Sequence, residues 1–263
     1  MTTAQKEYTT QLGAGLGLLA ETHTLLELWQ ADMDVTALYQ AALQSGRFPT
    51  VSARRLRNIV VEGFAPRYLI NNGKPATLLH KLQSTLTTYA LTQLLLLYTC
   101  RAHAILADFV CDVYWERSRA GYASLSNTDA QAFVTQAVQD GKTPRPWSEN
   151  TINNVASYLT GCCADYGLLE RGRRSTRKLR PYLLESTVAV YLAYDLHSAG
   201  LGDNMVISHP DWRLFGLDRT AVRDALKRVA LHGDLLIQTA GESLRIGWQY
   251  PNLEALTDVL AQR

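Results

Sequence analysis

The chain has 263 residues, of which 47% are hydrophobic and 19% are charged, a composition typical of a soluble globular protein and not of a disordered or fibrous one. Its 26 basic and 24 acidic residues leave a formal net charge of +2, so the total charge identifies no partner. At roughly 150 residues per domain, the length allows one or two domains with buried cores.

The apolar stretches are too short to predict a membrane span. The most apolar one, Tyr89–Cys100, has about twelve residues and is followed by Arg101, whereas a spanning helix needs roughly 20 apolar residues. The N-terminal segment carries Lys6 and Glu7 and lacks the pattern of a signal peptide. The four cysteines form no CxxC pair, so we expect reduced thiols in a cytoplasmic protein with no membrane partner.

The first part of the chain has the hydrophobic period of helices. Apolar residues recur at three- and four-residue steps over Thr24–Leu43, on either side of a short turn. Ser52 is placed to cap a following helix, and Asn71–Pro75 has the composition of a loop. A long helix, broken at most once, is expected over Thr77–Arg117. These elements predict an N-terminal helical bundle over residues 1–122.

The middle of the chain has the element order of a winged helix-turn-helix module. A helix over Ser126–Gln139 begins with a capping box, and a second helix is expected over Ser148–Tyr166. Two short strand candidates, Leu168–Glu170 and Leu179–Leu184, then flank a polar and basic tip. We expect this module to occupy residues 123–200.

The same order returns near the C-terminus, where residues 201–263 form the third predicted domain. Asp218 is placed to cap a helix over Arg219–Leu231, and a hairpin is expected from Leu235–Thr239 and Ser243–Trp248 around a turn at residues 240–242. The expected fold class is therefore mainly α: an N-terminal helical bundle followed by two winged helix-turn-helix-like modules with short β-hairpin wings.

The basic residues are concentrated in the central module. Residues 142–182 contain eight basic and three acidic residues, whereas residues 183–263 contain seven and ten. Six cations lie within the ten residues 171–180, here called the basic wing: Arg171, Arg173, Arg174, Arg177, Lys178 and Arg180. This arrangement predicts that the wing contacts DNA phosphates while the preceding helix enters the major groove.

Both predicted recognition helices carry side chains suited to nucleic acid. Three amides project away from the apolar face of the central helix: Asn150, Asn153 and Asn154. Asparagine can pair with adenine through two hydrogen bonds. Three cations at four-residue spacing share one face of the C-terminal helix: Arg219, Arg223 and Lys227. Because that segment has a net negative charge, both DNA and protein stay open as its ligand.

The sequence lacks the patterns of catalytic and metal sites. Gly13–Gly17 has the glycine spacing of a phosphate-binding loop but neither the strand before it nor the Lys-Ser/Thr after it, so we interpret it as a flexible entry to the first helix. The six histidines have no metal-ligand spacing, and no catalytic triad order or kinase signature occurs. We therefore expect no enzymatic activity, no metal and no cofactor.

Four blocks of the sequence occur in the same order in a known family: Leu12–Trp29, Ser52–Leu69, Leu96–Arg117 and Thr151–Glu170. They resemble the BrxA family, accessory proteins of BREX (bacteriophage exclusion) systems in bacteria. The resemblance covers roughly residues 8–190 and implies a helical, cytoplasmic, non-enzymatic component of phage defence that binds double-stranded DNA and other BREX proteins. The shorter members end near Tyr191–Leu201, so the C-terminal module is expected to be an extension.

We expect a non-enzymatic protein that binds double-stranded DNA, with phosphates on the basic wing and the Ser148 helix in the groove. If four to six wing cations contact phosphates, log affinity should fall with log salt at a slope of about −4 to −5. Two alternatives stay open. One is a protein–protein scaffold of the defence complex, and the other is an RNA-binding protein, because the family has been likened to a helical RNA-binding antitermination factor.

Overall fold

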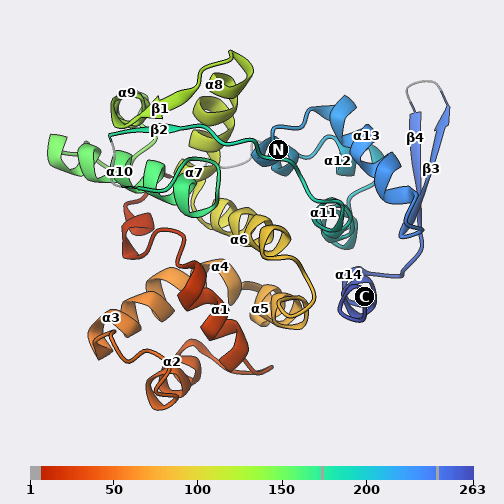
Figure 1. Ribbon diagram of the computed structural model, residues 1–263, viewed down its shortest axis with the longest axis horizontal. Coiled ribbons are helices and arrows are strands. Elements are labelled where there is room, and N and C mark those ends of the chain that lie inside the picture. The colour runs from red at the N-terminus through yellow and green to blue at the C-terminus, as the bar shows by residue number, and fades with distance from the viewer. Residues whose placement is uncertain (1–6, 173–174, 241–242) are drawn as a thin grey trace. The chain divides into compact units, whose positions relative to one another are not determined.

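A computed structural model describes residues 7–172, 175–240 and 243–263 (Figure 1). The described residues are mainly helical, which confirms the predicted mainly α class. Its short strands form two separate antiparallel pairs.

The chain divides into two compact units. The first contains the residues up to Thr77 together with Leu95–Tyr182, and the second contains Leu78–Leu94 together with Leu183–Arg263. The three domains expected from the sequence, with boundaries after residues 122 and 200, remain a prediction.

The first unit begins with short helices, two of which have a side-chain N-cap. They are α1 (Leu19–Leu28), α2 (Val35–Gln44), α3 (Ala53–Asn58), a π-helical segment (Ile59–Phe64), α4 (Ala65–Tyr68) and α5 (Ile70–Leu82), which continues past this unit. The Ser52 hydroxyl accepts a hydrogen bond from the backbone N of Arg55 at 3.3 Å, as predicted for the cap of α3. Left-handed backbone at Asn71, Asn72 and Gly73 confirms the predicted interruption there.

The predicted long helix from Thr77 to Arg117 is broken twice, not at most once. Its parts are the end of α5, α6 (Thr88–Ala102), α7 (Ala104–Phe109), a π-helical segment (Val110–Tyr114) and α8 (Trp115–Arg119). Extended backbone at His103 (φ −125°, ψ 92°) separates α6 from α7. Among the described residues no single helix is long and apolar enough to cross a membrane. The one helix pair that passes only when combined, Thr88–Ala102 with Ala104–Arg119, is bent by 118°.

The second half of the first unit surrounds a small sheet. Its elements are β1 (Ser124–Ser126), α9 (Asn127–Gln139), α10 (Glu149–Asp165) and β2 (Thr176–Lys178). β1 pairs antiparallel with β2, and a single bridge joins Leu169 to Leu179 on the other edge of β2. The capping box before α9 is confirmed, since the Ser126 hydroxyl accepts from Asp129 N while the Asp129 carboxylate accepts from Ser126 N.

Both predicted strands of this region were wrong, since Leu168–Glu170 also contributes only a bridge, at Leu169. The strand lies at Thr176–Lys178, inside the basic wing, whereas Leu179–Leu184 contributes only the bridge at Leu179. The cause is non-local: the backbone of β1, some fifty residues earlier, provides the ladder partner for β2. Neither three-residue strand has the alternation by which strands are recognised in a sequence.

The second unit carries a helix followed by a hairpin. Its elements are α11 (Ser186–Ser198), α12 (Asp203–Ile207), a 3-10 helix (Pro210–Phe215), α13 (Arg219–Ala230), β3 (Leu235–Ala240), β4 (Ser243–Trp248) and α14 (Leu253–Leu260). The Asp218 carboxylate caps α13 by accepting from Ala221 N at 2.8 Å, as predicted. The hairpin is confirmed, with Leu235 opposite Trp248; its predicted turn at residues 240–242 lies partly outside the described residues.

Candidate nucleic-acid interface

Helix α10 presents a polar face because its apolar face is buried. The Ser148 hydroxyl caps the helix by accepting from Thr151 N at 3.3 Å. Val155, Ala156 and Leu159 are fully buried, and α10 packs against α9. Of the three predicted reading amides, Asn150 and Asn154 are exposed and Asn153 is half-buried. The structure therefore brings the three asparagines to the accessible side of one helix.

The glycine-rich segment is held against α10 and is not the flexible entry that the sequence predicts. Gly17 N donates to the Asp165 carboxylate at 3.0 Å, and the Tyr166 hydroxyl donates to Gly17 O at 3.2 Å. A Cβ atom at Gly17 would lie 2.6 Å from Cβ of Asp165, and one at Gly13 would lie 2.6 Å from the ring of Tyr158. The glycines are thus needed for close backbone approach to α10, not for binding phosphate.

A buried arginine completes this attachment. Arg67, with 1% of its surface exposed, donates from Nη2 to Gly15 O at 2.7 Å and from Nη1 to Gly17 O at 3.5 Å. No carboxylate of the described residues pairs with it, and its Nε has no hydrogen-bond partner there. Sequence reasoning missed this residue because its partners lie fifty positions away.

Burial also determines the protonation of groups near this arginine. The pKa of His103 is lowered from 6.5 to about 4, first by burial and then by the positive charge of Arg67. Burial raises the pKa of Cys162 to about 12, so its thiol stays protonated at neutral pH. All four cysteines are free, as expected, and Cys162 has the character of a packing residue and not of a nucleophile.

The basic wing follows α10 directly. Arg171 is exposed and donates to Asp165 O, at the C-terminal end of α10, at 3.4 Å. Arg177 is half-buried and donates to Glu170 O at 3.4 Å, so it also stabilises the wing itself. Lys178 and Arg180 are exposed. Arg173 and Arg174 lie outside the described residues.

No carboxylate of the described residues pairs with any of the four described wing cations. Arg171 and Arg177 donate to backbone carbonyl oxygens, although the carboxylates of Asp165 and Glu170 lie close to the wing in the sequence. An exposed guanidinium or ammonium group without an acid partner keeps its charge available for another anion. This is the electrostatic condition that a phosphate-binding surface requires.

The asparagines and the wing lie at opposite ends of α10. Fifteen residues separate Asn150 from Asp165, which at 1.5 Å per residue is roughly 22 Å along the helix. Arg171 marks the wing end, by its bond to Asp165 O, and Asn150 marks the other end. A ligand that contacts both must be extended over about 20 Å, a distance longer than the ~12 Å width of a DNA major groove.

The cation row of α13 has a different environment. Arg219 donates to the Ser208 hydroxyl and to the Asn204 side-chain oxygen, both at 3.1 Å. Lys227 pairs with Asp224, one turn away on the same helix, at 3.5 Å. Arg223 is half-buried. Two of the three predicted contact residues are therefore engaged within their own unit.

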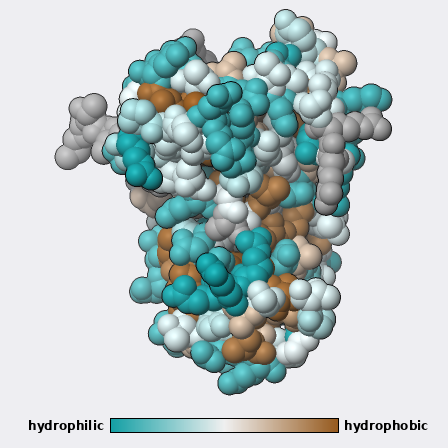
Figure 2. Space-filling model, turned by 90° about the vertical axis from the view of Figure 1, so that its left-hand side faces the viewer, coloured by the Kyte–Doolittle hydropathy of each residue, from teal (hydrophilic) through white to brown (hydrophobic). Residues whose placement is uncertain are grey.

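Polar residues dominate the outer surface on the side where α3 and α10 lie. Figure 2 shows this side, and hydrophilic residues cover most of it, with smaller apolar patches between them. The loop before α10 adds an exposed cation, Arg145, that sequence reasoning did not select. Such a surface suits a polar ligand better than a broad apolar contact.

The comparison with protein families identifies the chain. A family model described as BrxA matches residues 6–195.

 This match spans the whole described first unit and ends within α11, so α12 to α14 lie beyond it. The chain belongs to the BrxA family. It is accordingly a component of a BREX (bacteriophage exclusion) system, and thus of bacterial phage defence.

A solved structure shares the fold of this BrxA protein. It is described as the crystal structure of an uncharacterized protein from Magnetospirillum magneticum, and it matches with a TM-score of 0.56 at 16% sequence identity. The match covers 80% of this chain and 98% of that one. No curated protein matches the chain. At this identity the likeness concerns the fold alone.

Proposed function

We propose that this BrxA protein is a non-enzymatic component of its BREX system that binds double-stranded DNA through α10 and the basic wing. The order α8, β1, α9, α10, Leu168–Glu170, β2 supports a winged-helix interpretation. The pairing supports this interpretation, because β2 lies between β1 and the residue Leu169 that follows α10. In this scheme α10 is the recognition helix.

The observation that carries the proposal is the unpaired charge of the wing. Arg171, Lys178 and Arg180 are exposed, and no described carboxylate pairs with them. A duplex presents a regular line of phosphates, and each cation that neutralises one releases a condensed counterion. Since most of this charge suits the backbone and not base edges, we expect modest sequence preference, with the asparagines of α10 contributing what preference there is.

The test is a gel-shift titration with a charge-matched control. The variant Arg171→Ala/Lys178→Ala/Arg180→Ala removes three exposed wing cations, and we expect its affinity for a duplex to fall tenfold or more, at about 1 kcal/mol or more per lost contact. The control Arg54→Ala/Arg55→Ala/Arg57→Ala removes three exposed cations from α3 of the same unit. Equal losses in both variants, or no shift with the unaltered protein, would contradict the proposal.

The same titration distinguishes binding of DNA from binding of RNA. A hairpin RNA and a single-stranded DNA compete against the duplex at equal salt. We expect the duplex to compete best, because a recognition helix fits the DNA major groove and not the deep, narrow major groove of A-form RNA. Stronger competition by the hairpin RNA would favour the RNA-binding alternative.

A second function is proposed for the C-terminal module, namely contact with another protein of the BREX system. It is favoured by large apolar side chains that the second unit leaves in solvent: Leu231 is 86% exposed, Met205 60% and Leu236 58%. The segment from residue 183 onward is also net negative, which disfavours a polyanion. Leu231→Asp/Leu236→Asp should abolish co-purification with BREX components while leaving duplex binding unchanged.

A further inference from the structure

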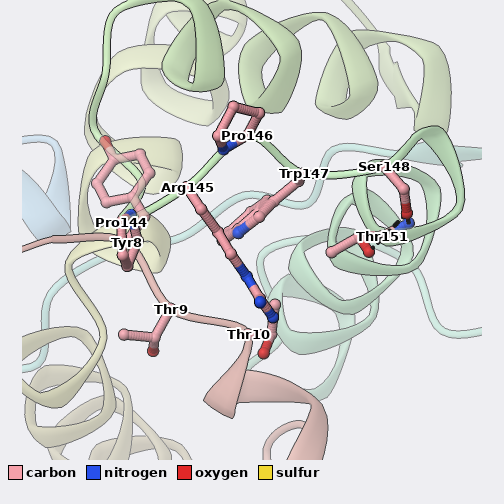
Figure 3. A pocket seen from close by; sticks show the side chains of 9 residues that line it. All are labelled: Tyr8, Thr9, Thr10, Pro144, Arg145, Pro146, Trp147, Ser148 and Thr151. Carbon is pink, nitrogen blue, oxygen red and sulfur yellow. Dashed lines mark hydrogen bonds between the residues drawn. The ribbon is translucent and has the colours of Figure 1, made fainter.

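A pocket of about 560 Å³ opens beside the N-terminal end of α10 (Figure 3). It is formed by the N-terminal segment, the α9–α10 loop and the first turn of α10. Its lining consists of Tyr8, Thr9, Thr10, Pro144, Arg145, Pro146, Trp147, Ser148 and Thr151. The volume lies within the range of about 300–1,000 Å³ found for small-molecule sites. None of the lining residues carries a carboxylate.

The walls of this pocket are held in place by interactions beneath it. Tyr8 N donates to Lys142 O at 2.8 Å, which joins the N-terminal segment to the α9–α10 loop. The Tyr8 hydroxyl donates to the Asp108 carboxylate, and its ring contacts Phe133. The N-terminal wall is therefore attached to the core of the first unit.

The loop that carries the pocket's cation is stiff. Pro144 and Pro146 flank Arg145 and restrict the backbone on both sides of it. The Thr143 hydroxyl donates to Arg145 O at 3.0 Å, which closes a tight turn. A ligand that binds here loses less free energy to loop ordering than it would on a flexible loop.

Two polar groups of the pocket, the Arg145 guanidinium and the Trp147 indole N–H, are available to a ligand. Figure 3 shows Arg145 and Trp147 extending from the loop into the pocket, toward the segment that carries Thr9 and Thr10. Among the described residues, no acceptor hydrogen-bonds the Arg145 guanidinium or the Trp147 indole N–H. Trp147 is half-buried, so part of its ring remains accessible.

We propose that this pocket binds a nucleoside monophosphate unit, with the phosphate on Arg145 and the base against Trp147. A guanidinium group can form two parallel hydrogen bonds to phosphate oxygens, and an indole ring is a stacking surface for any base. A phosphate alone would fill only a small part of the volume and would leave Trp147 without a contact. A carboxylate-free lining disfavours a cationic ligand.

Two sources can supply such a unit: a free mononucleotide, or a nucleotide unpaired in a strand. Both have the same chemistry at Arg145 and Trp147, and they differ in whether the unit is joined to neighbours. The inference does not depend on duplex binding by the basic wing, which lies at the other end of α10.

The test uses calorimetric titration of the full chain with AMP, adenosine and inorganic phosphate. We expect AMP to bind at least tenfold more tightly than adenosine or phosphate alone. Arg145→Ala should reduce AMP binding to the level of adenosine, Trp147→Ala should weaken both ligands, and Trp147→Phe should retain most of the affinity. Arg54→Ala is the control and should change nothing, since Arg54 lies on α3 outside the pocket.

A second arm distinguishes the sources. A duplex with one extra unpaired nucleotide is compared with the fully paired duplex, for the unaltered protein and for Trp147→Ala. A tenfold preference for the unpaired nucleotide that disappears in Trp147→Ala assigns the pocket to a strand. AMP binding without that preference assigns it to a free nucleotide. If neither ligand shows a dependence on Trp147, in a variant whose thermal unfolding matches that of the unaltered protein, the proposal is overturned, whatever the wing variant does to duplex affinity.

Discussion

Two helix–hairpin modules of this protein share an element order but differ in what surrounds their cations. After α10, the exposed cations Arg171, Lys178 and Arg180 have no carboxylate partner among the described residues. On α13, Arg219 is bound by two polar side chains and Lys227 is paired with Asp224. A shared order of elements therefore does not imply a shared ligand.

The two modules are also anchored differently. Helix α10 is fixed by a segment from the start of the chain, through Arg67 and the carbonyls of Gly15 and Gly17. The hairpin after α13 is fixed within its own unit, because the buried Asp234 is paired with Arg263 and its backbone oxygen accepts from Tyr194. The attachment of α10 buries the charged Arg67 without a carboxylate partner, which costs more free energy than burying the paired Asp234.

The largest effect is expected from removing the anchor of α10. Arg67→Ala leaves the buried Gly15 carbonyl oxygen without a donor, removes one of the two donors to Gly17 O and opens a cavity, so we expect a loss of about 3–4 kcal/mol in the free energy of unfolding. Chemical denaturation of the full chain measures it, with the exposed Arg54→Ala as control. A loss below about 1 kcal/mol would show that the glycine-rich segment is held by other contacts.

The next effect is a pH dependence of stability. His103 has a pKa of 6.5 when unfolded and about 4 when folded, so the unfolded chain takes up the proton first as the pH falls. The stability is therefore complete above about pH 6.5 and is lost toward pH 4, by about 3 kcal/mol in total.

His103→Gln isolates this contribution, because glutamine does not titrate. The difference in unfolding free energy between the variant and the unaltered protein should move in favour of the variant as the pH falls from 7 to 4. A difference that stays constant over this range would mean that His103 is not kept neutral by burial and Arg67.

The helix caps could be predicted from the sequence, and the anchors could not. Ser52, Ser126 and Asp218 each accept from the backbone N–H three residues further on, so a short window contains the whole interaction. Arg67 and Gly15 are 52 positions apart, and β1 and β2 are equally remote, so only the folded chain brings them together.

The candidate interface also has features that the sequence could predict and features that it could not. The basic wing and the three asparagines could be selected by composition and by position on a helix. The pocket at Arg145 and Trp147 could not, because its N-terminal wall comes from Tyr8–Thr10, more than 130 residues away in the sequence.

The smallest effect is expected on α13. Arg219→Ala/Arg223→Ala/Lys227→Ala removes as many charges as the triple wing variant, but we expect less than a threefold change in duplex affinity, since two of these cations already have partners. Gel-shift titration compares the two variants directly. A loss as large as that of the wing variant would place α13 in the DNA interface and remove the distinction between the modules.

The central claim is that the wing cations contact the phosphates of a duplex, and the salt dependence of binding tests it most directly. For the unaltered protein we expect log affinity to fall with log salt at a slope of about −4 to −5, and for Arg171→Ala/Lys178→Ala/Arg180→Ala a slope shallower by about 3. A slope that is the same in both proteins would contradict the account, because the wing would then release no counterions.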